Sequence, residues 1–211
     1  MQKSKALTYL ILIFMAAACA SAQVSAQRQT DVALSVYGAF DGTVGNPVAN
    51  ISETPTNSVG GMMELRHIVN SWLGFEAMYS LNPADQVYGV WCSLCTTPPP
   101  VSAYAHAFTG DWVFSSHSEK LRPFALVGVG ILYFQPVAST QGGNSWGPTQ
   151  SSTTPVYVYG VGIDREQWKH IGLRFQYRGN FYKAPYLLKY LSNVSNFTHT
   201  AEPALGVYYK F

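Results

Sequence analysis

The sequence predicts an all-β fold, namely an eight-stranded antiparallel up-and-down transmembrane β-barrel that is preceded by a cleavable signal peptide. Three observations predict it. Eight segments alternate between apolar residues and small or polar residues, the connections between them alternate between long and short, and the composition is poor in charge and rich in aromatic rings.

The N-terminus has the pattern of a secretory signal. Two lysines precede the apolar stretch "LTYLILIFMAAA", and the small residues of "ASAQ" follow at the spacing of a cleavage site. The apolar stretch is shorter than the ~20 residues that a membrane-spanning helix needs. We expect cleavage after Ala22, with cleavage after Ala26 as an alternative. The expected organisation is a signal peptide at 1–22, a short segment at 23–29 and the barrel at 30–211.

Cys19 leaves one alternative open, a lipoprotein that carries its lipid on this cysteine. The preceding "AAA" is a poor lipobox, because that motif normally begins with a leucine-like residue. In either case the chain is exported and attached to a membrane.

The composition is unusual for a soluble protein. Charged residues make up 11% of the chain, where roughly 25% is usual, and aromatic residues make up 14%. A water-exposed surface with so few charges would be sticky, so we expect something other than water to cover much of it. Without the signal, eleven basic residues face eleven acidic ones, which argues against a nucleic-acid partner.

Eight segments alternate in the manner of strands. They are expected at 30–40, 58–69, 72–81, 101–114, 122–135, 155–165, 169–180 and 201–211. A tilted strand crosses a bilayer with about 9–11 residues, and a closed sheet gives every backbone group a partner in lipid. The last strand is therefore expected to pair with the first.

The connections between these strands alternate in length. Those at 41–57, 82–100, 136–154 and 181–200 are long, and those at 70–71, 115–121 and 166–168 are short. Barrels of the bacterial outer membrane have short periplasmic turns and longer extracellular loops. The pattern therefore predicts this class of barrel, with the long loops outside.

The two faces of the strands differ in composition, and this difference indicates what each face contacts. In "HIGLRFQYRG" the set Gly172, Arg174, Gln176, Arg178 alternates with Ile171, Leu173, Phe175, Tyr177. Small residues beside a few large ones are typical of a narrow barrel interior, and aromatic rings near strand ends are typical of the two membrane interfaces. We therefore expect the apolar face to contact lipid and the small and charged face to line the interior.

Eight charged residues are expected inside the barrel, four of each sign. They are Glu64, Arg66, Glu76, Asp111, Asp164, Arg174, Arg178 and Lys210. An eight-stranded interior is about wide enough to be filled by side chains, which favours a structural network of ion pairs. A narrow pathway for small solutes is the alternative.

The mature chain resembles the small eight-stranded outer-membrane barrels of the opacity-protein and OmpA-like transmembrane-domain type. The resemblance rests on the signal, the loop pattern, "RPFALVGVGILYF" in the fifth strand and "ALGVYYKF" at the end of the chain. It implies a monomer in the outer membrane that contacts membrane lipid and lipopolysaccharide. It also implies that Phe211 is part of the signal by which the outer-membrane assembly machinery recognises the last strand.

Cys92 and Cys95 lie in the second long loop as "WCSLC". A zinc site needs two more ligands, and the sequence offers no second CxxC or HxxxH motif. Because the loop is expected to face the oxidising exterior, we expect a local disulfide, with free thiols or a metal or redox role as alternatives.

The sequence offers only weak candidates for catalysis. Some outer-membrane lipid A deacylases use serine, histidine and a carboxylate, and "SHSEK" places His117, Ser118 and Glu119 in a row. Neighbouring strand residues point to opposite faces, whereas a triad needs converging side chains. His199 lies on the outer side, with Ser192 and Ser195 as the nearest candidate serines. We expect a structural or surface-interaction role without enzymatic turnover, cofactor or metal; a lipid A-modifying enzyme or a narrow solute channel are the alternatives.

Overall fold

The computed structural model describes residues 29–46, 51–70, 72–90, 100–116, 121–141, 144–145, 149–188 and 196–211. These residues form strands and the connections between them. No helix in this described part is long and apolar enough to cross a membrane. The expected signal peptide at 1–22 and Cys19 lie outside the described residues.

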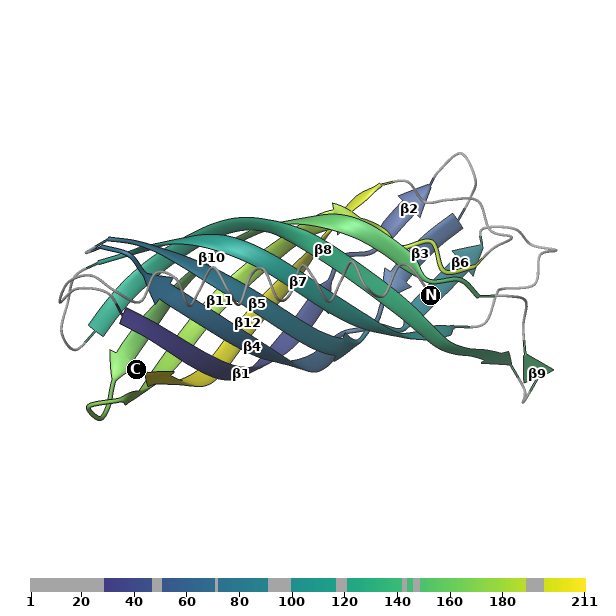
Figure 1. Cartoon of the computed structure of the whole chain (residues 1–211). Coiled ribbons are helices and arrows are strands. Elements are labelled where there is room, and N and C mark those ends of the chain that lie inside the picture. The colour runs from purple at the N-terminus through teal and green to yellow at the C-terminus, as the bar shows by residue number, and fades with distance from the viewer. Residues whose placement is uncertain are drawn as a thin grey trace, which may run out of the picture.

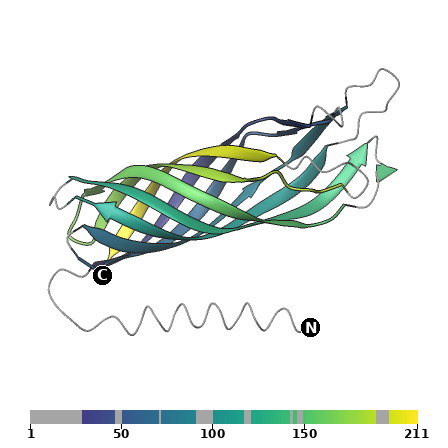
Figure 2. The ribbon, with the colours of Figure 1, turned by 90° about the horizontal axis from the view of Figure 1, so that it is seen from above.

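Eight long antiparallel strands close into a barrel (Figures 1 and 2). They are β1 (Gln29–Asp41), β4 (Ser58–Ile68), β5 (Leu73–Pro83), β7 (Val101–Ser115), β8 (Leu121–Gln141), β10 (Ser152–Glu166), β11 (Ile171–Lys183) and β12 (Phe197–Lys210). Each strand pairs with its neighbour in this order, and β12 pairs with β1 from Asp31↔Lys210 to Asp41↔Thr200. The prediction of an eight-stranded antiparallel up-and-down barrel is confirmed.

The two ends of the barrel differ. The C-terminus and the short connections lie at one end, which we call the turn end (Figure 1). Four short strands lie at the opposite end, which we call the loop end: β2 (Val44–Asn46), β3 (Ile51–Pro55), β6 (Gln86–Val90) and β9 (Asn144–Ser145). These short strands lie within connections that the sequence predicts as loops, because segments of two to five residues are too short to show a clear alternation.

Burial alternates along the long strands as the sequence predicts. On β10, Val156 and Val158 are almost fully buried, whereas Tyr157 and Val161 are 54% and 58% exposed. Large apolar side chains cover the outside of all eight strands, for example Leu34 at 65% and Leu205 at 53% exposed. Soluble proteins rarely expose contiguous apolar patches larger than a few hundred Å², so this exterior fits hydrocarbon.

Inside, large rings fill the space that glycines leave. The Phe124 ring lies against Gly162 of β10, and the Tyr208 ring lies over Gly172 of β11. Glycine is poorly suited to strand interiors unless another group approaches closely. These glycines therefore make room for rings inside a barrel that has little free width.

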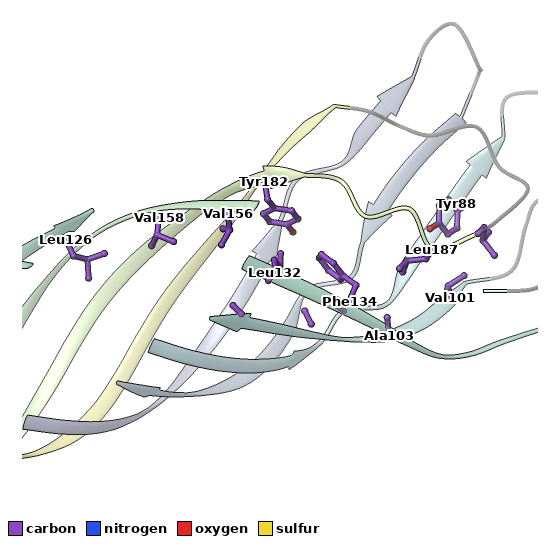
Figure 3. Close-up of a cluster of buried hydrophobic side chains, with 14 of the residues drawn as sticks. Tyr88, Val101, Ala103, Leu126, Leu132, Phe134, Val156, Val158, Tyr182 and Leu187 are labelled. Atoms are coloured by element: carbon purple, nitrogen blue, oxygen red, sulfur yellow. The ribbon is translucent and has the colours of Figure 1, made fainter. Parts of the chain in front are cut away.

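The interior holds an apolar cluster and a group of charged side chains. Buried apolar side chains of β7, β8 and β10 form a cluster that runs from Val113 and Phe124, near the turn end, toward the loop end, and Figure 3 shows it continuing to Leu187 and Tyr88. Leu187 follows β11 and is fully buried, and its carbonyl accepts a hydrogen bond from the amide of Gln150 at 3.0 Å. The charged residues lie beside the turn-end part of this cluster, where the Arg66 guanidinium lies over the Phe124 ring.

Candidate functional site: the interior charge network

Three fully buried arginines organise the interior charges. Arg66 comes from β4, and Arg174 and Arg178 come from inward-facing positions of β11. None of the three is more than 1% exposed. A guanidinium has five N–H donors in a fixed planar arrangement, so each arginine can join several carboxylates. We call the arginines and their carboxylate partners the charge network.

Arg66 joins opposite walls of the barrel. Its Nη2 lies 2.6 Å from Oε2 of Glu76 on neighbouring β5, and its Nη1 lies 3.1 Å from Oδ2 of Asp164 on β10. β4 and β10 are four positions apart in a ring of eight strands, so the second pair crosses the interior. The guanidinium also lies 4.1 Å from the centre of the Phe124 ring, where a cation is attracted to the ring face.

Arg174 has four carboxylate partners. Its Nε lies 2.8 Å from Oδ1 of Asp164, its Nη2 lies 2.9 Å from Oδ1 of Asp31, and its Nη1 lies 3.4 Å from Oε2 of Glu64. A fourth carboxylate, that of Glu76, lies 3.8 Å from Nη1. Glu64 also accepts hydrogen bonds from the Gln176 amide and, at 3.2 Å, from the Ser35 hydroxyl. Asp164 therefore links Arg174 to Arg66.

Arg178 makes a second crossing of the interior. Its Nη1 lies 2.8 Å from Oε1 of Glu76 on β5, which is directly opposite β11, and its Nη2 lies 2.5 Å from Oδ2 of Asp111 on β7. The Thr109 hydroxyl donates to the same Asp111 oxygen at 3.0 Å. Glu76 thus contacts both Arg66 and Arg178, and the network is continuous.

The observed charge network differs from the expected set of interior charges at two residues. Asp31 is 1% exposed and belongs to the network, although it was absent from the expected charges. The sequence does indicate this position, because Asp31 lies on the same face of β1 as Ala33 and Ser35, at alternate positions along the strand. Lys210 lies apart at the turn end, where it pairs with a partly exposed Glu166 at 2.8 Å.

The carboxylates of the network outnumber its cations. Asp31, Glu64, Glu76, Asp111 and Asp164 face three arginines. Hydrogen bonds from Ser35, Thr109 and Gln176 supply the further donors. Buried charges need such partners, because an unpaired charge in the interior is very costly.

The other candidate residues lie outside the network. The amide of Phe211 donates to the Thr30 carbonyl at 3.0 Å, and its ring is 73% exposed. The His199 ring accepts or donates one hydrogen bond with the Tyr159 hydroxyl at 3.1 Å on the outer face of the barrel. Outside the described residues lie Cys92, Cys95, His117, Ser118, Glu119, Ser192 and Ser195. Within the described part of the chain, no group of three His, Cys, Asp or Glu residues could hold a metal ion.

Comparison with solved structures finds the same fold. The structure of Ail, the attachment invasion locus protein of Yersinia pestis, in complex with sucrose octasulfate is 14% identical, covers 88% of this chain and all of that chain, and has a TM-score of 0.54. Neisserial surface protein A is 12% identical over 90% of this chain and all of that chain, with a TM-score of 0.53. OprG from Pseudomonas aeruginosa is 14% identical over 88% of this chain and 96% of that chain, with a TM-score of 0.50. At these identities the likeness shows the fold alone.

Comparison by sequence identifies the family. No curated protein matches this sequence. The family model described as the outer membrane protein beta-barrel domain matches residues 10–211, which is nearly the whole chain. The apolar exterior, the closed sheet and this match agree with one another: the chain belongs to the outer membrane protein beta-barrel domain family, and its barrel lies in the bacterial outer membrane.

Proposed function

We propose that the protein has a structural or surface-interaction role, with an interior closed by side chains, long loops outside the cell and no enzymatic turnover. One observation carries this proposal. The pairs Arg66–Asp164 and Arg178–Glu76 each join strands on opposite sides of the barrel, at 3.1 and 2.8 Å. Side chains in contact across the full width leave little room for solutes along the axis.

The energetics of the network support a closed interior. Removing one partner of a buried ion pair costs about 3–5 kcal/mol, because it leaves an uncompensated charge. A path for ions would have to separate several of these pairs at once, since Glu76 contacts three arginines and Asp164 contacts two. We infer that the network holds the wall strands together and that the barrel does not conduct.

The orientation of the barrel supports a proposal about its contacts. Short turns of such barrels are periplasmic and long loops are extracellular, so the loop end faces the exterior. Loops on a rigid scaffold commonly carry recognition. We propose that a monomeric barrel contacts membrane lipid and lipopolysaccharide through its apolar exterior, and the assembly machinery through β12 and Phe211.

The direct test combines conductance with stability. Glu76→Gln is expected to lower the free energy of unfolding by about 3–5 kcal/mol, because Arg66 and Arg178 lose their shared carboxylate. Wild type and variant should both show no steady conductance in planar bilayers. Glu166→Gln at the turn end is the matched control and should leave both properties near wild type.

The same test can contradict the proposal. Discrete conductance steps in wild type would favour the narrow channel. Unchanged stability of Glu76→Gln with altered ion flux would favour it as well. For the absence of turnover, mass spectrometry of lipid A after incubation with the refolded barrel is the check, and loss of an acyl chain would contradict it.

A further inference from the structure

A second group of polar residues, buried except for the partly buried Asp41, lies on three neighbouring strands, nearer the loop end than the charge network. Asp41 of β1 and Asn180 of β11 both pair with Thr200 of β12, and Glu202 is the next inward residue of β12. Tyr182, which points into the barrel in Figure 3, is the next inward residue of β11. These five residues form what we call the outer polar site.

The outer polar site contains two carboxylates and no cation. Among the described residues, Asp41 and Glu202 form no ion pair. Arg178 pairs with Glu202 in the β11–β12 register, but its guanidinium is directed to Glu76 and Asp111. If both groups are ionised, the site therefore carries two negative charges that have no direct ion-pair partner among the described residues.

Hydrogen bonds draw these side chains together. The Tyr182 hydroxyl lies 2.9 Å from the Thr200 hydroxyl and donates to Oδ1 of Asp41 at 3.3 Å, and Thr200 also donates to Asp41. The Asn180 side chain lies close enough to the Glu202 carboxyl group to interact with it. The two carboxylates thus lie in two small groups, which the pairing of Thr200 with both Asp41 and Asn180 brings side by side.

Two oxygens in this group face no donor. Oε2 of Glu202 and Oδ1 of Asn180 are buried and have no hydrogen-bond partner, and both residues are at most 5% exposed. A buried acceptor without a donor is costly, and a buried carboxylate without a partner is more so. An electropositive ligand at this point would satisfy both oxygens.

We propose that the outer polar site binds one Ca²⁺ ion. Its donors are all hard oxygens, with a carboxylate from Asp41, a carboxylate from Glu202, the amide oxygen of Asn180 and the hydroxyl of Thr200. Ca²⁺ takes carboxylate and amide oxygens in irregular arrangements completed by water, whereas Mg²⁺ demands near-ideal octahedral geometry. The two negative charges match the charge of the ion. The site lies toward the exterior, so the ion would enter from outside the cell.

Terbium luminescence tests the site directly. The barrel is refolded in detergent with chelator and then titrated with Tb³⁺, which takes the same oxygen ligands as Ca²⁺ and is excited through nearby tyrosine rings such as Tyr182. Wild type should gain saturable luminescence at about one Tb³⁺ per chain, and CaCl₂ should displace it. Glu202→Gln should lose this signal, because it removes a charge while keeping the shape of the side chain.

Thermal unfolding gives an independent readout on the same proteins. Refolding with CaCl₂ should raise the unfolding midpoint of wild type by several degrees over NaCl of equal ionic strength, and Glu202→Gln should lose most of this rise. Glu166→Gln is the matched control: it removes a carboxylate from the turn end and should keep the full response.

Several results would overturn the assignment. They are no calcium effect in wild type, an equal effect in wild type and Glu202→Gln, or an equal rise with MgCl₂. If Glu202→Gln fails to refold, Asp41→Asn takes its place in both measurements. A calcium site here would leave the proposed closed interior unaffected, since conductance is measured separately.

Discussion

At the scale of single residues, a few buried carboxylates in the barrel interior each contact more than one arginine. Asp164 accepts from both Arg66 and Arg174, and Glu76 lies between Arg66 and Arg178. In a buried setting such shared carboxylates offset the desolvation of the guanidinium groups. Alternation along the strands was enough to predict that these residues face inward. The prediction left out Asp31, which also lies at an inward-facing position but stands near the start of β1.

Asp164→Asn tests this sharing at a second position. The change keeps the shape but removes the charge that faces two arginines, so the free energy of unfolding should fall by about 3–5 kcal/mol. Glu166→Gln breaks a pair whose side chains are 22% and 29% exposed, and pairs near the surface contribute about 0–1 kcal/mol. Urea unfolding of both variants in lipid vesicles measures the difference. Equal losses would show that burial does not set the strength of these pairs.

At the scale of the elements, the long strands were predictable and the short ones were not. The expected segment 155–165 compares with Ser152–Glu166 for β10, because eleven alternating residues give a clear period. β3 and β6 gain their order from pairing with each other beyond the barrel wall, with Glu53 opposite Tyr88. Such pairing is a tertiary effect, and five residues carry too little pattern to reveal it.

Glycines of β10 and β7 give a prediction with a built-in control. A Cβ at Gly162 would lie 2.6 Å from the Phe175 carbonyl oxygen and would also meet the Phe124 ring, whereas a Cβ at Gly110 meets nothing within 4 Å. Gly162→Ala should therefore destabilise the barrel by about 1–3 kcal/mol through overpacking, and Gly110→Ala should not. Unfolding in vesicles compares the two. Equal stability of both variants would contradict the close packing of Phe124.

Glu53 gives a pH-dependent prediction for the β3–β6 pair. Burial raises the pKa of Glu53 from its ordinary value of 4.5 to about 8, and its Oε1 has no partner. Between these values the folded pair binds more protons than the open one, so its stability should fall as the pH rises. Glu53→Gln stays neutral and should lose this dependence.

Hydrogen exchange of the β3 and β6 amides measures the effect of Glu53. The ratio of wild-type to Glu53→Gln exchange rates at each pH removes the intrinsic rate, which both proteins share. The ratio should rise from pH 5 to pH 9, because the carboxylate ionises in the wild type alone. A ratio that does not change with pH would show that Glu53 is not held in an apolar setting.

At the scale of the whole molecule, closure of the sheet determines which residues meet across the interior. The strand count and the loop pattern predicted the closed barrel, but the partners across the interior were beyond reach of the sequence. Arg66 and Asp164 are 98 positions apart, and their contact depends on how far each strand is shifted against its neighbour. The same is true of the outer polar site, whose residues come together only when β12 pairs with β1.

The central claim is that hydrocarbon covers the apolar face of a closed barrel while the other face lines its interior. NMR of the methyl-labelled, otherwise deuterated protein in lipid nanodiscs tests it without any mutation, by magnetisation transfer from lipid acyl chains. Transfer is predicted to Leu34, Val36 and Val161, which are 65%, 62% and 58% exposed. None is predicted to Val113, Val156 and Val158, which are at most 2% exposed. Transfer to the second set, or none to the first, would contradict the account.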